Sequence, residues 1–268
     1  MKEHTKNMLL KQARNNVQDS NARYDIIPPR FAIRGAAAQV ISIFVEHIDK
    51  YLSKFKLGSN SSFDAVYTQY ADGSEATFSI NGRQVDVADT PVGDFFDAVP
   101  DTIITIIATN EPPDGIEPEV LDAAYSHDVD DEDDFGEIEV AISLPKSPLA
   151  VVDFLSSRHV EIQGLLAHEM QHTIQKIVMG YRLPSGATST LKAHATDYFE
   201  IDARVEEVIA MMPHTIEEDN AKEFKKQLGV CLDNYLSRNA QPHDDIELLK
   251  EEMIVSHMDA YELKMKNY

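Results

Sequence analysis

The run Ile162–Val178, IQGLLAHEMQHTIQKIV, is the most informative part of this chain of 268 residues. Apolar residues recur in it at the three- and four-residue spacings of an amphipathic helix, and Gly180 soon follows as a residue suited to ending a helix. The pattern predicts a buried helix from about Arg158 to Met179. Inside that helix, His168 and His172 are four residues apart, so their rings lie on one side, one turn above the other.

The segment from His168 to His172, HEMQH, has the form His-Glu-x-x-His. Two histidines at this spacing can bind one metal ion together, while Glu169, about 100° further round the helix, can reach a metal-bound water without binding the ion. A base beside polarised water is the basis of metal-assisted hydrolysis. The alternative is an exposed helix that carries two histidines by chance. The apolar flanks favour the metal site, because two histidines and a glutamate buried there need partners.

A catalytic zinc site usually has three protein ligands and an open position for water, so a third ligand is expected elsewhere in the chain. A second amphipathic helix is predicted from Asp197 to Met212, and its apolar face comprises Ile201, Val205, Val208, Ile209 and Met212. Glu200 lies at the edge of that face and is the leading candidate, with Asp202 as the competing one. Glu206 and Glu207 are predicted to lie on the solvated side of the helix.

The two motifs together, HEMQHTIQ and EIDAR, resemble the gluzincin branch of the zincin metallopeptidases, in particular short members encoded by phages and mobile elements. The resemblance covers a small part of the chain, from about His168 to Arg204. It implies that His168, His172 and Glu200 bind Zn²⁺, with water at the fourth position. It also implies that Glu169 accepts a proton as this water attacks a carbonyl, and then passes the proton to the leaving amine of a peptide bond.

Two parts of such a site are less well defined by the sequence. The better-studied gluzincins continue as Asn-Glu-x-x-x-Asp, but here Arg204 stands four residues after Glu200. The carboxylate that orients a ligand histidine is therefore unassigned, with Asp202 as a candidate. A donor to the oxyanion of the transition state is also expected, and His194 and Tyr198 lead because the connection before a zincin's glutamate helix often lines the cleft. Weaker candidates, each better explained by a surface or packing role, are Tyr181, Arg204, His214 and His257.

The order of the expected elements is that of a zincin-like α+β domain: a helix, a small mixed sheet, the HExxH helix and the glutamate helix. Helices are also predicted from Phe31 to about Phe55, and after Pro213 at Ile216–Ser237 and Asp244–Lys266. Strands are predicted at Ala65–Tyr70, Ala76–Ile80, Gln84–Val87, Thr102–Ala108 and Ile138–Leu144. By resemblance, the last of these borders the cleft and can pair with an extended substrate. The expected organisation is a polar N-terminal arm (1–28), a zincin-like metallopeptidase domain (29–213) and a helical C-terminal extension (214–268), which caps the domain or serves in oligomerisation.

The chain is strongly acidic, with 46 acidic and 24 basic residues and a formal net charge of −22. Such a surface repels phosphate backbones and anionic membranes, so no nucleic-acid or membrane partner is expected. No apolar run is long enough to cross a bilayer, and the N-terminus lacks the apolar core of a signal peptide. We therefore expect a cytoplasmic protein, or one in the host cytoplasm or virion if it is phage-encoded. The single cysteine, Cys231, cannot form an internal disulfide and is expected to be a small buried residue.

The sequence leaves alternatives open. The enzyme would take a peptide or protein substrate, either broadly or from one partner only. The rival is a structural protein with virion or assembly partners, in which a zincin scaffold keeps a structural or vestigial zinc site. Glu169 favours the enzyme, because a structural zinc does not need it. The acidic run Asp128–Asp134 is partly like a calcium-binding loop, but Asp133 stands where such a loop needs glycine, which favours a solvated loop.

Overall fold

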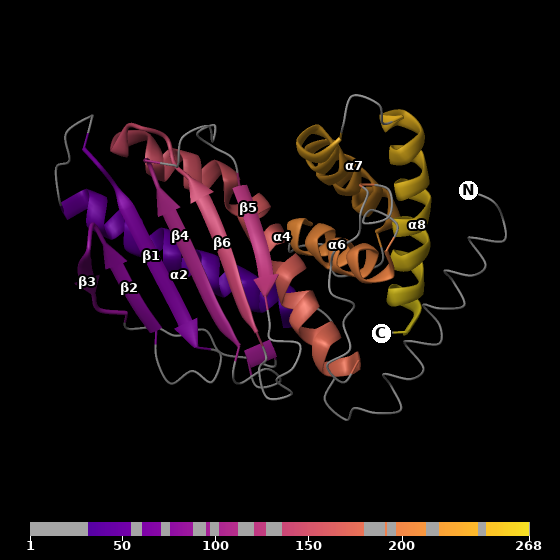
Figure 1. The fold of residues 1–268 in the computed structure, drawn as a ribbon, viewed down its shortest axis with the longest axis horizontal. Coiled ribbons are helices and arrows are strands. Elements are labelled where there is room, and N and C mark those ends of the chain that lie inside the picture. The colour runs from indigo at the N-terminus through magenta and orange to yellow at the C-terminus, as the bar shows by residue number, and fades with distance from the viewer. Residues whose placement is uncertain are drawn as a thin grey trace.

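A computed structural model describes residues 32–54, 61–70, 76–87, 95–96, 102–111, 121–126, 136–179, 191, 197–212, 220–240 and 245–267. Over these ranges the protein has an α+β fold (Figure 1). An N-terminal helix precedes a six-stranded mixed sheet, and four helices follow the sheet. The predicted α+β class is thus confirmed.

The sheet consists of β1 (Asp64–Tyr70), β2 (Ala76–Ile80), β3 (Arg83–Val85), β4 (Ile103–Thr109), β5 (Leu121–Ser126) and β6 (Glu137–Ser143). The strand order is β3–β2–β1–β4–β6–β5. Neighbouring strands are antiparallel except for β4 and β6, which run parallel. All strands except β5 lie within two residues of their predicted bounds.

One face of the sheet is buried. Along β6, the buried residues Ile138, Val140 and Ile142 alternate with exposed ones, as expected for a strand covered on one side. Helices α2 (Ala32–Lys54) and α4 (Pro148–Met179) run behind the sheet in Figure 1 and share one apolar core with its buried face. This core makes α4 a rigid base for the residues that it carries.

Helix α4 begins at Pro148, well before the start predicted near Arg158. Proline suits the first turn of a helix, where its missing N–H has no partner to lose. The polar run Ser156–His159 interrupts the apolar pattern and hid the continuation. Val151 and Leu155 are nevertheless fully buried, so the apolar stripe of the helix extends across the interruption.

Strand β5 was not predicted, because its sequence, LDAAYS, is rich in residues that are poor strand formers. It pairs antiparallel with β6 at one edge of the described sheet and contacts α4. The expectation that Ile138–Leu144 borders the cleft is therefore wrong, since β6, which contains nearly all of that segment, lies between β4 and β5. The strand edge next to α4 belongs to β5.

Three helices lie beside the sheet layer: α6 (Tyr198–Met211), α7 (Ala221–Asn239) and α8 (Ile246–Asn267) (Figure 1). Their apolar side chains form a second core, to which Val208, Leu232 and Met253 contribute. The predicted helices after residue 213 correspond to α7 and α8, while the predicted domain limits remain predictions. None of the helices described here has the length and apolarity needed to span a membrane.

Gly136, which precedes β6, has a positive φ of 86°. A Cβ atom at this position would lie 2.5 Å from Cε2 of Tyr125 and 2.6 Å from the carbonyl oxygen of Ser126. The second contact is with backbone, so rotation of a side chain cannot relieve it. Glycine therefore allows β5 and its tyrosine to approach the start of β6.

Gly136→Ala should lower the free energy of unfolding by more than about 1 kcal/mol, because alanine disfavours this backbone conformation and would clash with β5. Gly229→Ala is the matched control: no neighbour lies within 4 Å of a Cβ at that site inside α7. The control should stabilise the protein by about 0.5–1 kcal/mol. Urea unfolding measures both changes, and an equal response of the two variants would contradict the account of Gly136.

Candidate metal centre

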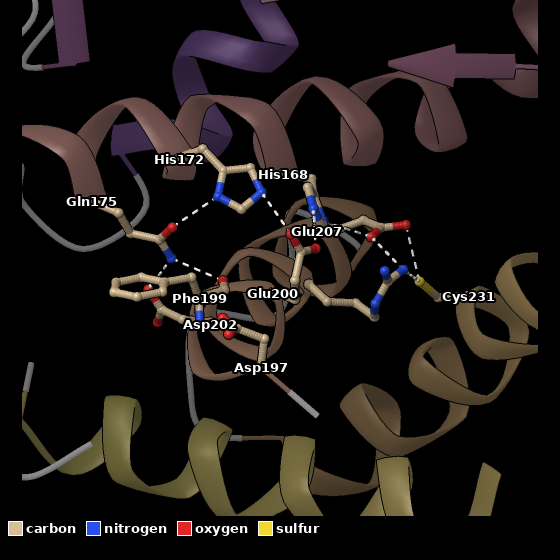
Figure 2. A network of polar contacts seen from close by, with 10 residues as sticks. His168, His172, Gln175, Asp197, Phe199, Glu200, Asp202, Glu207 and Cys231 are labelled. Carbon is tan, nitrogen blue, oxygen red and sulfur yellow. Dashed lines mark hydrogen bonds and ion pairs between the residues drawn. The ribbon is translucent and has the colours of Figure 1, made fainter. Parts of the chain in front are cut away.

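His168 and His172 on α4 both face Glu200 in the first turn of α6 (Figure 2). Nε2 of His168 lies 3.4 Å from Oε2 of Glu200, and Nε2 of His172 lies 3.7 Å from Oε1. One ligand atom from each residue lies within 4.8 Å of the other two. Ligand atoms arranged tetrahedrally around one zinc ion lie about 3.3 Å apart. The three predicted ligands thus form a cluster that could hold a metal ion.

Helix α6 is fixed at both ends, and this places Glu200. At the N-terminus, the carboxylate of Asp197 accepts a hydrogen bond of 2.8 Å from a backbone N–H of the first turn. At the C-terminus, helix carbonyls without an intrahelical partner accept hydrogen bonds from other helices. Gln163 of α4 donates to the carbonyl of Ala210 at 2.9 Å, and Arg34 of α2 donates to that of the C-cap residue.

The close crossing of α4 and α6 depends on Gly164, one turn before His168. A Cβ at position 164 would lie 2.7 Å from Cγ of Met211 and 3.3 Å from Cγ of Glu207. A glycine here lets α6 lie close to α4 beside the histidines.

Gln175 determines which nitrogen of His172 carries the proton. The amide nitrogen of Gln175 donates to the backbone carbonyl of Phe199 and to Oδ2 of Asp202, both at 3.0 Å. The amide oxygen, 2.8 Å from Nδ1 of His172, must then be the acceptor, so Nδ1 bears the proton. The lone pair of Nε2 therefore faces Glu200, as metal binding requires.

His168 is oriented by Glu207. Its Nδ1 lies 3.2 Å from Oε2 of Glu207, and because a carboxylate only accepts, Nδ1 is the donor. Glu207 also accepts hydrogen bonds from Arg204 at 3.3 Å and from the thiol of Cys231 on α7 at 2.9 Å (Figure 2). Glu207 thus occupies the position of the orienting carboxylate that the sequence left unassigned.

The prediction that Glu206 and Glu207 face solvent is wrong, since they are only 7% and 6% exposed. The apolar periodicity of α6 identified one buried face, but α7 and α8 cover a second, charged face. Lys264 of α8 lies 2.6 Å from Glu206, which gives that buried carboxylate a partner. Cys231, predicted to be buried, is buried and in addition donates the hydrogen bond to Glu207.

The charges of the metal-free site follow from these contacts. Burial disfavours the charged form of His168, but its hydrogen bonds to Glu200 and Glu207 outweigh this and raise its pKa to about 10. Burial and the charge of His168 lower the pKa of His172 to about 4. Burial raises the pKa of Glu169 to about 7, although His168 opposes the rise. An imidazolium thus lies beside a neutral imidazole, and Glu169 titrates in a range that suits a general base.

Glu169 lies beside the edge strand β5. Its carboxylate accepts a hydrogen bond from the backbone N–H of Tyr125. The ring of Tyr125 stacks on His172, with centroids 6.3 Å apart and an interplanar angle of 27°. The centre is therefore built from α4 and α6 and bordered by β5.

The competing ligand candidate, Asp202, does not join the cluster. Its Oδ2 accepts hydrogen bonds from Gln171 and Gln175 of α4, and its Oδ1 lies 3.1 Å from Nζ of Lys264 on α8. Burial would raise the pKa of Asp202, but the charge of Lys264 and these hydrogen bonds lower it. Asp202 therefore holds helices together as a carboxylate.

The predicted oxyanion donors, His194 and Tyr198, stay predictions. Tyr198 is the first residue of α6, but its side chain lies outside the described residues, as do His194, Tyr181, His214 and the acidic run Asp128–Asp134. Arg204 is buried against Glu207 with its guanidinium 4.1 Å from the ring centroid of Tyr235. His257 is fully buried, and its Nδ1 donates to the carbonyl of Met253.

Comparisons with known proteins assign no family. No family model matches the chain, and neither a curated protein nor a solved structure matches it. The evidence for a metal centre is therefore the arrangement of its own side chains.

His168→Ala should abolish tight zinc binding, because it removes one of three ligands. The matched control is His159→Ala, which removes an exposed histidine of the same helix. Equilibrium dialysis with metal analysis should show one zinc ion per chain for the wild type and the control. Full zinc occupancy in His168→Ala would contradict the ligand assignment.

Zinc binding at pH 7 should release about one proton, because His168 is protonated in the metal-free protein and a metal ligand must be neutral. Affinity should therefore rise about tenfold per pH unit between pH 6 and 8, below the pKa of about 10. Calorimetric titrations in buffers of different ionisation enthalpy count the proton. Binding without proton release would show that His168 is already neutral.

Proposed function

We propose that this protein is a zinc-dependent peptide hydrolase with a zincin-like fold of the gluzincin type. One observation carries the proposal: His168, His172 and Glu200 converge on one point, and Glu169 lies beside them at the edge of the sheet. The N₂O donor set is that of catalytic zinc sites with two histidines and a glutamate.

The donor set fits zinc in detail. Both Nδ1 atoms donate to protein acceptors, Glu207 and Gln175, so Nε2 of each histidine is the atom that would bind zinc. Within the described ranges the ligand cluster has three members, which leaves a coordination position for water. When bound, zinc supplies the Lewis acidity that activates water for attack on a carbonyl.

Glu169 acts as the general base and then as the general acid. It accepts the proton of the attacking water and delivers it to the leaving amine. Its burial and the hydrogen bond from Tyr125 hold the carboxyl group on the side of the site that borders β5. A substrate on that side would lie next to both Glu169 and the strand.

The edge of β5 is the surface on which an extended peptide would bind. The N–H of Tyr125 points away from β6 towards Glu169, and because strand N–H groups alternate in direction, that of Ala123 points the same way. A peptide that adds as a further strand would pair with groups such as the N–H of Ala123 and present its scissile bond next to Glu169 and the metal centre.

Glu169→Gln should retain zinc affinity within about threefold and reduce peptide cleavage at least about 100-fold, because the amide accepts no proton at neutral pH. Glu139→Gln, on the exposed face of β6, is the matched control and should cleave as the wild type does. A fluorescent unfolded protein is a suitable substrate. Wild-type rates in Glu169→Gln would show that another group is the base.

The structural alternative makes a different prediction about zinc coordination. An enzyme should have three protein ligands and one water, whereas a structural zinc is closed by four protein ligands. X-ray absorption spectroscopy of the zinc-loaded protein distinguishes the two. Four protein ligands together with absent cleavage would favour a structural or assembly role.

A further inference from the structure

The buried side of α6 connects the metal-binding histidines to both C-terminal helices. The first connection runs from Nδ1 of His168 to Oε2 of Glu207. The other oxygen of Glu207, Oε1, accepts the hydrogen bond of 2.9 Å from the thiol of Cys231 on α7. Cys231 is buried. One carboxylate, that of Glu207, therefore lies between its thiol and His168.

The second connection starts at His172 and ends on α8. Nδ1 of His172 donates to Gln175, whose amide nitrogen donates to Asp202. Lys264 of α8 lies 3.1 Å from Asp202 and 2.6 Å from Glu206, and its side chain is only 12% exposed. The ammonium group of Lys264 is thus placed between two buried carboxylates of α6.

The second connection passes through the amide of Gln175, which can either donate or accept a hydrogen bond. The amide oxygen of Gln175 accepts the hydrogen bond from Nδ1 of His172 only while the amide nitrogen faces acceptors, namely Asp202 and the carbonyl of Phe199. If Asp202 moved, the amide could turn and offer its nitrogen to His172. Nδ1 would then have to accept, and the proton would lie on Nε2, where it blocks metal binding.

We propose that Lys264 and Cys231 are positioning residues of the metal centre, through which α8 and α7 hold in place the groups that accept hydrogen bonds from Nδ1 of the two ligand histidines. Lys264 acts on His172 through Asp202 and Gln175, and Cys231 acts on His168 through Glu207. The proposal rests on the proposed zinc binding, but it concerns the ligand histidines and does not require that the protein cleave a substrate.

Lys264→Met is the first test, because methionine keeps the apolar stem and removes the charge. Zinc affinity should fall about tenfold, in the range seen when outer partners of metal ligands are lost. Lys264→Arg should recover most of the affinity. Lys250→Met is the matched control, since Lys250 is also on α8 but pairs with the exposed Asp233 of α7. Competition with a chromophoric chelator measures the affinities.

Cys231 is tested by comparing alanine with serine. Cys231→Ala removes the donor to Glu207 and should weaken zinc binding about 3- to 10-fold, whereas Cys231→Ser keeps a donor and should bind nearly as the wild type does. Leu228→Ala, which opens a cavity in the second core and keeps both the thiol of Cys231 and Glu207, controls for a purely structural effect. It should lower stability and leave the zinc affinity of the folded protein unchanged.

Nitrogen NMR of protein labelled at histidine reports the proton positions directly, with and without zinc. In the metal-free wild type His172 should be neutral with its proton on Nδ1, and Lys264→Met should show the Nε2-protonated form as well. Unchanged tautomers and unchanged zinc affinity in Lys264→Met and Cys231→Ala would overturn the proposal. An Nε2-protonated His172 in the wild type would overturn it even if no zinc bound.

If the inference holds and cleavage is absent, only the proposed hydrolase activity fails. If cleavage is present and the variants bind zinc normally, only the inference fails.

Discussion

A histidine can offer Nε2 to a metal ion only when its proton is on Nδ1, and this requirement organises the whole centre. The two histidines meet it differently. His168 donates a hydrogen bond to a carboxylate, which can only accept. His172 donates to the amide of Gln175, which can either accept or donate a hydrogen bond. The orientation of this amide is fixed by Asp202, which accepts a hydrogen bond from Gln175 between α4 and α6.

The charges around the histidines, like the geometry, favour a cation at this site. Five acidic side chains gather there, Glu169, Glu200, Asp202, Glu206 and Glu207, and ion pairs join some of them to Arg204 and Lys264. The acids exceed these bases, and burial makes such an excess costly. The raised pKa of His168 is the response of the metal-free site, since its proton offsets part of the excess. A divalent cation would offset more of it, and would displace that proton.

Much of the fold and the grouping of His168, His172 and Glu200 could be predicted from the sequence, because both depend largely on local patterns. Strands such as β4 and β6 are rich in β-branched residues, and the spacing of His168 and His172 fixes their common side on a helix. Strand β5 could not be predicted, because its alanines, aspartate and serine form a strand only through pairing with β6. The burial of Glu207 was missed for a related reason: it is produced by α7, which is distant in sequence, and periodicity within α6 carries no information about it.

The buried carboxylates of α6 also explain why the C-terminal helices have to pack where they do. Glu207 is enclosed with Arg204 and Cys231, and Glu206 with Lys264, so each acid has its partner inside the protein. Removal of one partner from a buried ion pair typically costs about 3–5 kcal/mol, far more than the pair itself contributes. Wrong packing of α8 is thereby penalised, because it would leave Glu206 without Lys264, and wrong packing of α7 would remove the thiol of Cys231 from Glu207. The packing of the C-terminal helices and the orientation of His168 and His172 thus share two carboxylates of α6, Glu207 and Asp202.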